Sequence, residues 1–125
     1  MKNYPKLSKN FSRHEAACKC GCGFDTADVL TTAIIQQVRD YVDEKVIVTS
    51  WCRCEKHNKD AGGKPDSQHL YGRAVDFYVV GYSRAQHLEL FRWIEETLMK
   101  GEGGLRLYKR KNFIHLDTRT TGVWR

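Results

Sequence analysis

The sequence predicts an α+β fold, a small and mostly antiparallel sheet with helices packed on it. In two long segments, apolar residues recur at three- and four-residue steps, the period of an amphipathic helix. Short β-branched or alternating stretches lie around them, as is typical of strands. For 125 residues with 41% hydrophobic content, we expect one domain over residues 1–125 with one modest core.

The helices are predicted from caps and apolar periodicity. Residues 12–15 (Ser-Arg-His-Glu) fit a capping box, so a helical turn begins there. Residues 26–44 are expected to form an amphipathic helix. Ser83 is expected to cap a helix that runs to about Lys100, where a glycine-rich segment ends it. The predicted buried faces are Leu30, Ala33, Ile34, Val38, Tyr41 and Val42 in the first helix, and Leu88, Phe91, Ile94 and Leu98 in the second.

The strands are predicted from β-branched runs and alternation. They cover residues 46–51, 73–80, 105–108 and 112–118, and a basic turn joins the last two. Residues 18–24 are expected to be loop because of their glycines, and the polar residues 55–68 are expected to form a long loop.

The formal net charge of +6 favours an anionic partner: nucleic acid, an anionic membrane or an acidic cell-wall polymer. The densest basic run, Lys109-Arg110-Lys111, fits a solvated turn better than a nucleic-acid patch, so no nucleic-acid partner is expected. No apolar run approaches the roughly 20 residues of a membrane span. The first residues lack the apolar stretch of a secretory signal, so we expect synthesis in the cytoplasm. We also expect a monomer.

Five cysteines lie in two clusters, Cys18-Lys19-Cys20-Gly21-Cys22 and Cys52-Arg53-Cys54. The odd count argues against complete disulfide pairing. The C-x-C-x-C spacing differs from the C-x₂-C of common structural zinc sites. Free thiols, one disulfide between the clusters and a structural metal all stay open.

The alternation of side chains along the predicted strands indicates a second group of polar residues, apart from the cysteines. Asp76 lies on the face of its strand opposite the apolar Val75, Phe77 and Val79. A charged group among hydrophobic neighbours is costly unless it is paired, and a metal ion would supply the partner. If the strand that carries His115 lies beside it, Asp76 and His115 converge, and His69 arrives from the preceding loop. Two imidazoles and a carboxylate form a three-ligand zinc set with an open fourth position.

Simpler interpretations stay open at this point. A single histidine is more often a packed or surface residue than a ligand, and His14, His57 and His87 are assigned to that class. Arg53 follows a strand, where its guanidinium could bind a carboxylate or be an ordinary surface charge.

The segment Ser67-x-His69-x-x-Gly72-x-Ala74-x-Asp76 closely resembles the signature of the D-alanyl-D-alanine carboxypeptidase family of zinc peptidases. That family includes peptidoglycan endopeptidases and shares a fold with the Hedgehog signalling domain, so the resemblance implies a Hedgehog/DD-peptidase-like fold. Residues 11–23 resemble a small subgroup common in phages and prophages. Residues 49–53 resemble its T-S-G-Y-R segment, with Trp51 and Cys52 departing, and residues 113–117 resemble its F-V-H-V-D strand. The resemblance spans roughly residues 11–124.

The resemblance implies Zn²⁺ as cofactor, with His69, Asp76 and His115 as ligands. It implies that Arg53 binds the substrate carboxylate or holds the scissile carbonyl, and that Ser67 contributes to substrate binding. Relatives place an acid or a histidine just before the last ligand, where this chain has Asn112 and Phe113. We therefore assign the general base to Asp117, the acid on the same strand face as His115.

The implied function is zinc-dependent hydrolysis of peptide bonds in bacterial peptidoglycan, as a D-Ala-D-Ala carboxypeptidase or a stem or cross-link endopeptidase. A phage or prophage lysis enzyme that reaches the wall after release or holin-type export fits the expected cytoplasmic synthesis. One rival is a non-catalytic, zinc-containing cell-wall-binding module of the same fold. Another is a basic nucleic-acid-binding protein whose zinc is held by the cysteines.

Overall fold

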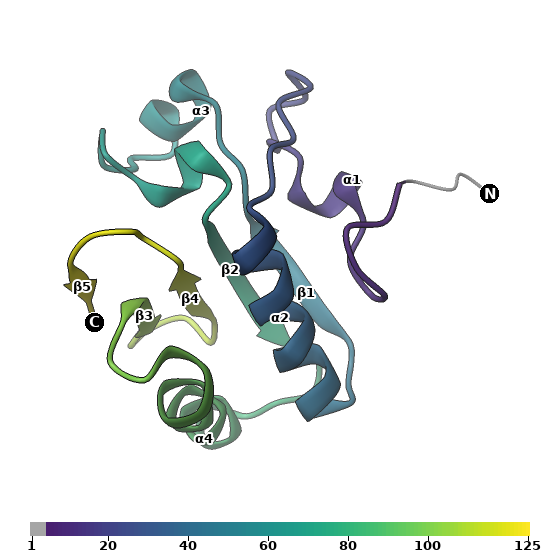
Figure 1. The fold of residues 1–125 in the computed structure, drawn as a ribbon, viewed down its shortest axis with the longest axis vertical. Helices are drawn as coiled ribbons and strands as arrows, with labels where there is room; N and C mark the ends of the chain where they lie inside the picture. Colours follow the sequence, from purple (N-terminus) through teal and green to yellow (C-terminus); the bar gives the residue numbers. More distant parts are fainter. Residues whose placement is uncertain (1–4) are drawn as a thin grey trace.

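A computed structural model describes residues 5–125, in which one five-stranded sheet is combined with helices (Figure 1). The strand order is β1-β2-β4-β3-β5, and within these residues only β3 and β5 pair in parallel. The predicted α+β class is confirmed. The strands are β1 (Val46–Ser50), β2 (Ala74–Val79), β3 (Gly103–Leu107), β4 (Ile114–Asp117) and β5 (Val123–Trp124).

The helices pack around this sheet. Figure 1 shows α2 crossing in front of β1 and β2, α4 at the end of the molecule next to β3, and α3 at the opposite end. Among residues 5–125, no helix is long and apolar enough to cross a membrane. The N-terminal residues 1–4, on which the signal-peptide expectation partly rests, lie outside the described part. The helices are α1 (Arg13–Ala16), α2 (Val29–Val42), α3 (Glu55–Asp60), α4 (Arg84–Ile94), the 3-10 helix η1 (Gln68–Tyr71) and the π-helical turn η2 (Glu95–Met99).

The predicted capping box of α1 and the predicted Ser83 cap of α4 are both present, and the second also forms a capping box. At α1, the Glu15 carboxylate accepts a hydrogen bond from the backbone N–H of Ser12 at 3.0 Å. At α4, the Ser83 hydroxyl accepts from the N–H of Gln86 at 3.2 Å, and the Gln86 side chain accepts from the N–H of Ser83 at 2.8 Å. These contacts satisfy donors that the first turn of a helix leaves unpaired, so the two starting points were predictable.

The predicted buried stripe of α2 is partly wrong. Ala33 is exposed, and Leu30 and Tyr41 leave 58% and 54% of their surface exposed. The buried face is instead Thr31, Thr32, Ile34, Ile35, Val38 and Val42. The reason is a polar residue inside the face: the Thr31 hydroxyl bonds to the Arg73 carbonyl at 3.0 Å and to Thr118 Oγ1 at 2.8 Å. An apolar pattern does not reveal a buried threonine.

The buried face of α4 differs in the same way. Leu88 is exposed, whereas His87, Leu90 and Ile94 are buried. Phe91 and Leu98 are half-buried against the core. The cause is His87, which is 1% exposed and whose Nε2 accepts a hydrogen bond from the N–H of Val79 on β2 at 3.1 Å.

The segment predicted as a long loop contains helix α3 over residues 55–60, so that prediction is wrong there. Cys54 caps the start of this helix, and its sulfur accepts a hydrogen bond from the N–H of His57 at 3.4 Å. Cysteine is not among the residues that usually cap helices, which is why the start was missed.

Trp51 anchors the end of β1 in the core. It is fully buried, its ring meets Phe11 edge-on at 6.4 Å between centroids, and its Nε1–H donates to the Gly72 carbonyl at 2.9 Å. A buried indole needs such an acceptor, so the contact fixes the end of β1 against the turn that precedes β2.

His87 predicts a pH-dependent stability. Burial lowers its pKa and the Arg84 charge acts in the same direction, although a hydrogen bond to the Ser83 carbonyl opposes them. Tyr82 and Asn112 are its other polar neighbours. Because the folded-state pKa lies below the unfolded value of about 6.5, this stabilisation is complete above that pH and is lost as pH falls through the folded pKa.

We therefore expect His87→Gln to reduce the loss of unfolding free energy between about pH 7.5 and about pH 5.5, because glutamine stays neutral. Urea unfolding of both proteins at the two pH values measures it. An identical pH dependence in the variant would contradict the assignment.

Candidate metal centre

The pairing of β2 with β4 brings Asp76 and His115 together, because the two residues are direct partners in the antiparallel register. His69 lies in η1, which ends at Gly72 just before β2. Nε2 of His69 lies 3.3 Å from Oδ2 of Asp76, and Nδ1 of His115 lies 2.7 Å from Oδ1. All three side chains are buried, at 3%, 7% and 7% exposed. The structure thus brings together the three predicted ligands.

The donor set fits a zinc ion. The three ligand atoms all lie within 4.8 Å of one another. A tetrahedral ion with ligands at about 2.0–2.1 Å would separate them by about 3.3 Å. The distance from His69 Nε2 to Asp76 Oδ2 matches this value, whereas the 2.7 Å between His115 Nδ1 and Asp76 Oδ1 is a direct hydrogen bond that a metal ion would replace. Two imidazoles and a carboxylate are also the ligand types that leave a catalytic zinc one open position.

The outer nitrogen of each imidazole has its own acceptor. His69 Nδ1 lies 2.7 Å from the Trp51 carbonyl, and His115 Nε2 lies 2.8 Å from Oδ2 of Asp117. At His69 the Trp51 carbonyl can only accept, so Nδ1 carries the hydrogen and Nε2 is left to bind a metal. Both nitrogens of His115 face a carboxylate, and Nδ1 is the one on the side of Asp76. Nε2 of His69 and Nδ1 of His115 are therefore the expected ligand atoms.

Asp76 is ionised in this setting. Burial acts to raise its pKa, but hydrogen bonds with His115 and His69 outweigh it and hold the pKa well below the usual range. The Arg53 guanidinium adds a positive charge 3.6 Å from Oδ2. A buried carboxylate surrounded by these groups is a ready anionic ligand.

Arg53 reaches the centre from the segment after β1. Its Nε donates to Ser50 Oγ at 3.0 Å and its Nη1 to Asn58 Oδ1 at 3.3 Å, which leaves Nη2 beside Asp76. Ser67 lies next to the centre as the cap of η1, with its hydroxyl accepting from the N–H of His69 at 3.2 Å. The expected substrate-binding roles of Arg53 and Ser67 stay predictions.

Asp117 lies behind His115 and is fully buried. Its Oδ1 accepts from Nε of Arg119 at 2.8 Å, and its Oδ2 accepts from Nη2 of Arg119 at 2.7 Å and faces His115 Nε2. Burial acts to raise the Asp117 pKa, but these hydrogen bonds lower it below its usual range. Gly104 lies opposite on β3, and a Cβ there would run into this carboxylate. The absent side chain is what gives Asp117 room.

The two residues at the positions where the resemblance implies a general base make other contacts. Asn112 is exposed and donates to the Tyr82 carbonyl at 3.1 Å. Phe113 stacks on Tyr108 with centroids 4.4 Å apart. Among the described residues, His14, His57 and His87 lie outside the His69, Asp76 and His115 group.

The centre opens into a groove of about 640 Å³. Its walls include Lys64, Asp66, Tyr108 and Trp124, which the sequence did not single out. Trp124 belongs to the two-residue strand β5 and meets the His115 ring edge-on at 5.1 Å. Two residues carry no detectable periodicity, so β5 and its contact with the centre left no sequence signal.

The comparison with protein families agrees with this geometry. A family model described as Peptidase M15 matches residues 9–117, a span that contains the three ligands, Arg53 and Asp117. No curated protein matches the chain. The chain belongs to the Peptidase M15 family of zinc peptidases, and its buried His69, Asp76 and His115 group is able to bind the metal ion.

Proposed function

We propose that the chain hydrolyses peptide bonds of bacterial peptidoglycan, as a D-Ala-D-Ala carboxypeptidase or as an endopeptidase of the stem or cross-link. The observation that carries the proposal is the His69, Asp76 and His115 group at the wall of a groove that also contains the Arg53 guanidinium. We further propose that the chain is made in the cytoplasm and acts on the wall after release or holin-type export, as a phage lysis enzyme does.

The groove supports a peptide substrate that carries carboxylates. Its volume of about 640 Å³ lies within the range of about 300–1,000 Å³ typical of small-molecule sites. Arg53, Lys64 and Arg119 line it together with the carboxylates of Asp66, Asp76 and Asp117. Peptidoglycan stems end in carboxylates, and the cationic groups of Arg53 and Lys64 beside the centre can pair with them.

The chain's own residues would bind and orient this substrate. Because two of its three nitrogens are held by Ser50 and Asn58, the Arg53 guanidinium presents Nη2 in one fixed direction next to Asp76. A preorganised cation can hold a terminal carboxylate or a carbonyl oxygen without losing further side-chain freedom. Zinc bound at the centre would polarise the scissile carbonyl and activate a water molecule.

The contacts of Asp117 favour a role other than the general base that the sequence predicts. Both oxygens are engaged, and the carboxylate faces the outer nitrogen of His115 rather than the nitrogen that faces Asp76. We therefore propose Asp117 as a positioning residue that fixes the ring and tautomer of His115, as carboxylates behind metal-bound histidines do. Asp66, whose carboxylate lines the groove, is then the residue to test as general base.

Asn112 favours a second candidate, a zinc-containing module that binds the wall without cutting it. Its amide donates to the Tyr82 carbonyl, at a position where the resemblance implies an acid. A chain with the metal group but without a base would bind peptides and not turn them over.

His69→Ala and His115→Ala are each expected to remove one zinc per chain and to abolish clearing of purified peptidoglycan, because each deletes a ligand. Metal analysis, zymography and far-UV circular dichroism on the same preparations measure this. His57→Ala is the matched control, because His57 lies outside the metal group, and it should keep both properties. Folded ligand variants with full zinc and full clearing would refute the proposal. Wild-type protein that binds peptidoglycan without clearing would favour the binding module.

Arg53→Lys is expected to lower kcat/KM on muropeptides by about tenfold or more, because lysine cannot keep the two charge-assisted bonds that orient the guanidinium. Zinc content should not change. Arg39→Lys, on α2 and away from the groove, is the control. Chromatography with mass spectrometry of the products gives the rates and identifies the bond that is cut. An unchanged kcat/KM would remove Arg53 from substrate binding.

Asp117→Asn separates positioning from base catalysis. For a positioning residue, zinc affinity falls by about 10–100-fold and turnover recovers when zinc is in excess. For a base, zinc affinity is kept and turnover stays low at every zinc concentration. Chelator competition and steady-state rates distinguish these results, and Asp66→Asn is the parallel variant. A base-like result would contradict the positioning role.

A further inference from the structure

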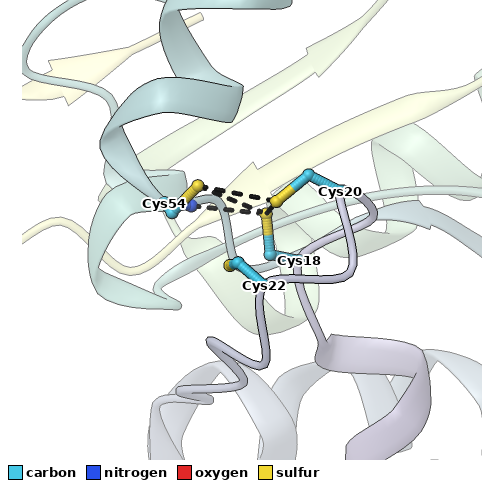
Figure 2. A group of neighbouring side chains, drawn as sticks. All are labelled: Cys18, Cys20, Cys22 and Cys54. Atoms are coloured by element: carbon cyan, nitrogen blue, oxygen red, sulfur yellow. Dashed lines mark hydrogen bonds between the residues drawn. The ribbon is translucent and has the colours of Figure 1, made fainter.

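Four cysteines from two distant parts of the chain meet in a second cluster, separate from the His69, Asp76 and His115 group. Figure 2 shows the sulfurs of Cys18, Cys20 and Cys54 turned toward one another. Cys22 lies beside them, on the loop that also carries Cys18 and Cys20. The four sulfur atoms all lie within 4.8 Å of one another. We propose that Cys18, Cys20, Cys22 and Cys54 hold a structural zinc ion.

The distances between the sulfurs support a shared metal. Cys18 and Cys20 are 3.3 Å apart, Cys18 and Cys54 are 3.8 Å apart, and Cys20 and Cys54 are 3.7 Å apart. A disulfide needs about 2.05 Å. A tetrahedral zinc ion with Zn–S bonds of about 2.3 Å places its sulfurs about 3.8 Å apart. Cys18, Cys20 and Cys54 therefore have the spacing of three thiolates on one zinc ion, and Cys22, within 4.8 Å of each of them, supplies the fourth sulfur.

The backbone is arranged to support thiolate ligands. The N–H of Cys54 donates to the Cys18 sulfur at 3.4 Å, and the N–H of His57 donates to the Cys54 sulfur at 3.4 Å. Such outer contacts orient and stabilise metal-bound sulfur. Gly21 and Gly23 adopt φ of 82° and 91°, which lets the chain turn twice within the loop that carries Cys18, Cys20 and Cys22. When zinc binds, the thiol protons pass to the solvent.

The fifth cysteine is not part of this set. Cys52 is buried and lies outside the group of sulfurs that are mutually close. Four ligands and one remaining thiol account for all five cysteines.

The site would fix the segment that carries Arg53. The N–H of Cys52 donates to the Ala16 carbonyl and the N–H of Arg53 to the His69 carbonyl, each at 3.0 Å. Cys54 follows directly and begins α3. Zinc at Cys54 would add a third attachment to this segment and tie it to the loop over residues 18–22. The inference does not depend on the proposed peptidase function, because it concerns a separate group of residues.

Metal content of the full chain tests the proposal. We expect two zinc ions per wild-type chain, one in the double variant His69→Ala with His115→Ala, and one in the double variant Cys20→Ser with Cys22→Ser, whose positions are exposed. Cys52→Ala is the matched control and should keep two. A folded His69→Ala and His115→Ala protein without zinc would overturn the proposal.

Cobalt substitution keeps the test decisive if the cysteine variants do not fold. Cobalt in the double histidine variant should give intense visible bands and thiolate-to-cobalt charge transfer, whereas the absence of thiolate charge transfer would overturn the proposal. An intact mass lower by two hydrogens per disulfide in the freshly purified wild-type chain would also overturn it. Neither readout requires activity, so failure here leaves the proposed function untouched.

Discussion

The pairing of β2 with β4 is the constraint on which the metal centre depends. It sets Asp76 directly opposite His115, so a carboxylate is buried within hydrogen-bond distance of an imidazole. Because side chains alternate along a strand, a slip of one residue would turn Asp76 into the apolar core and remove it from His69 as well. The apolar partners Val75 and Leu116 in the same register resist such a slip, since they would leave the core. Core packing and the placement of the ligands therefore require the same strand register.

Residues next to this strand pair hold the two histidine ligands through their outer ring nitrogens. The Trp51 carbonyl fixes the ring of His69, while the Trp51 indole is itself held by the Gly72 carbonyl at the start of β2. Asp117 does the same for His115 and is held in turn by Arg119. Each outer partner belongs to an element that also builds the core or the groove. Preorganised ligands of this kind reduce the cost of ordering the site when metal binds.

The sequence predicted the fold class, the capped helix starts and the convergence of His69, Asp76 and His115, because these follow from alternation, caps and a specific signature. It failed where polar residues take core positions, as Thr31 and His87 do, since an apolar pattern cannot identify a buried hydrogen-bonded side chain. It also failed at α3, because a cysteine sulfur caps that helix. The role of Asp117 depends on Arg119 and on the direction of the His115 ring, which only the tertiary structure gives.

The central claim is that zinc binds to Nε2 of His69, Nδ1 of His115 and the carboxylate of Asp76. Anomalous diffraction at the zinc edge, from crystals of the zinc-loaded chain, tests it most directly. We expect a peak about 2 Å from Nε2 of His69, Nδ1 of His115 and a carboxylate oxygen of Asp76. A zinc-loaded crystal with no peak among these residues, or with the imidazoles bound through their other nitrogens, would contradict the account.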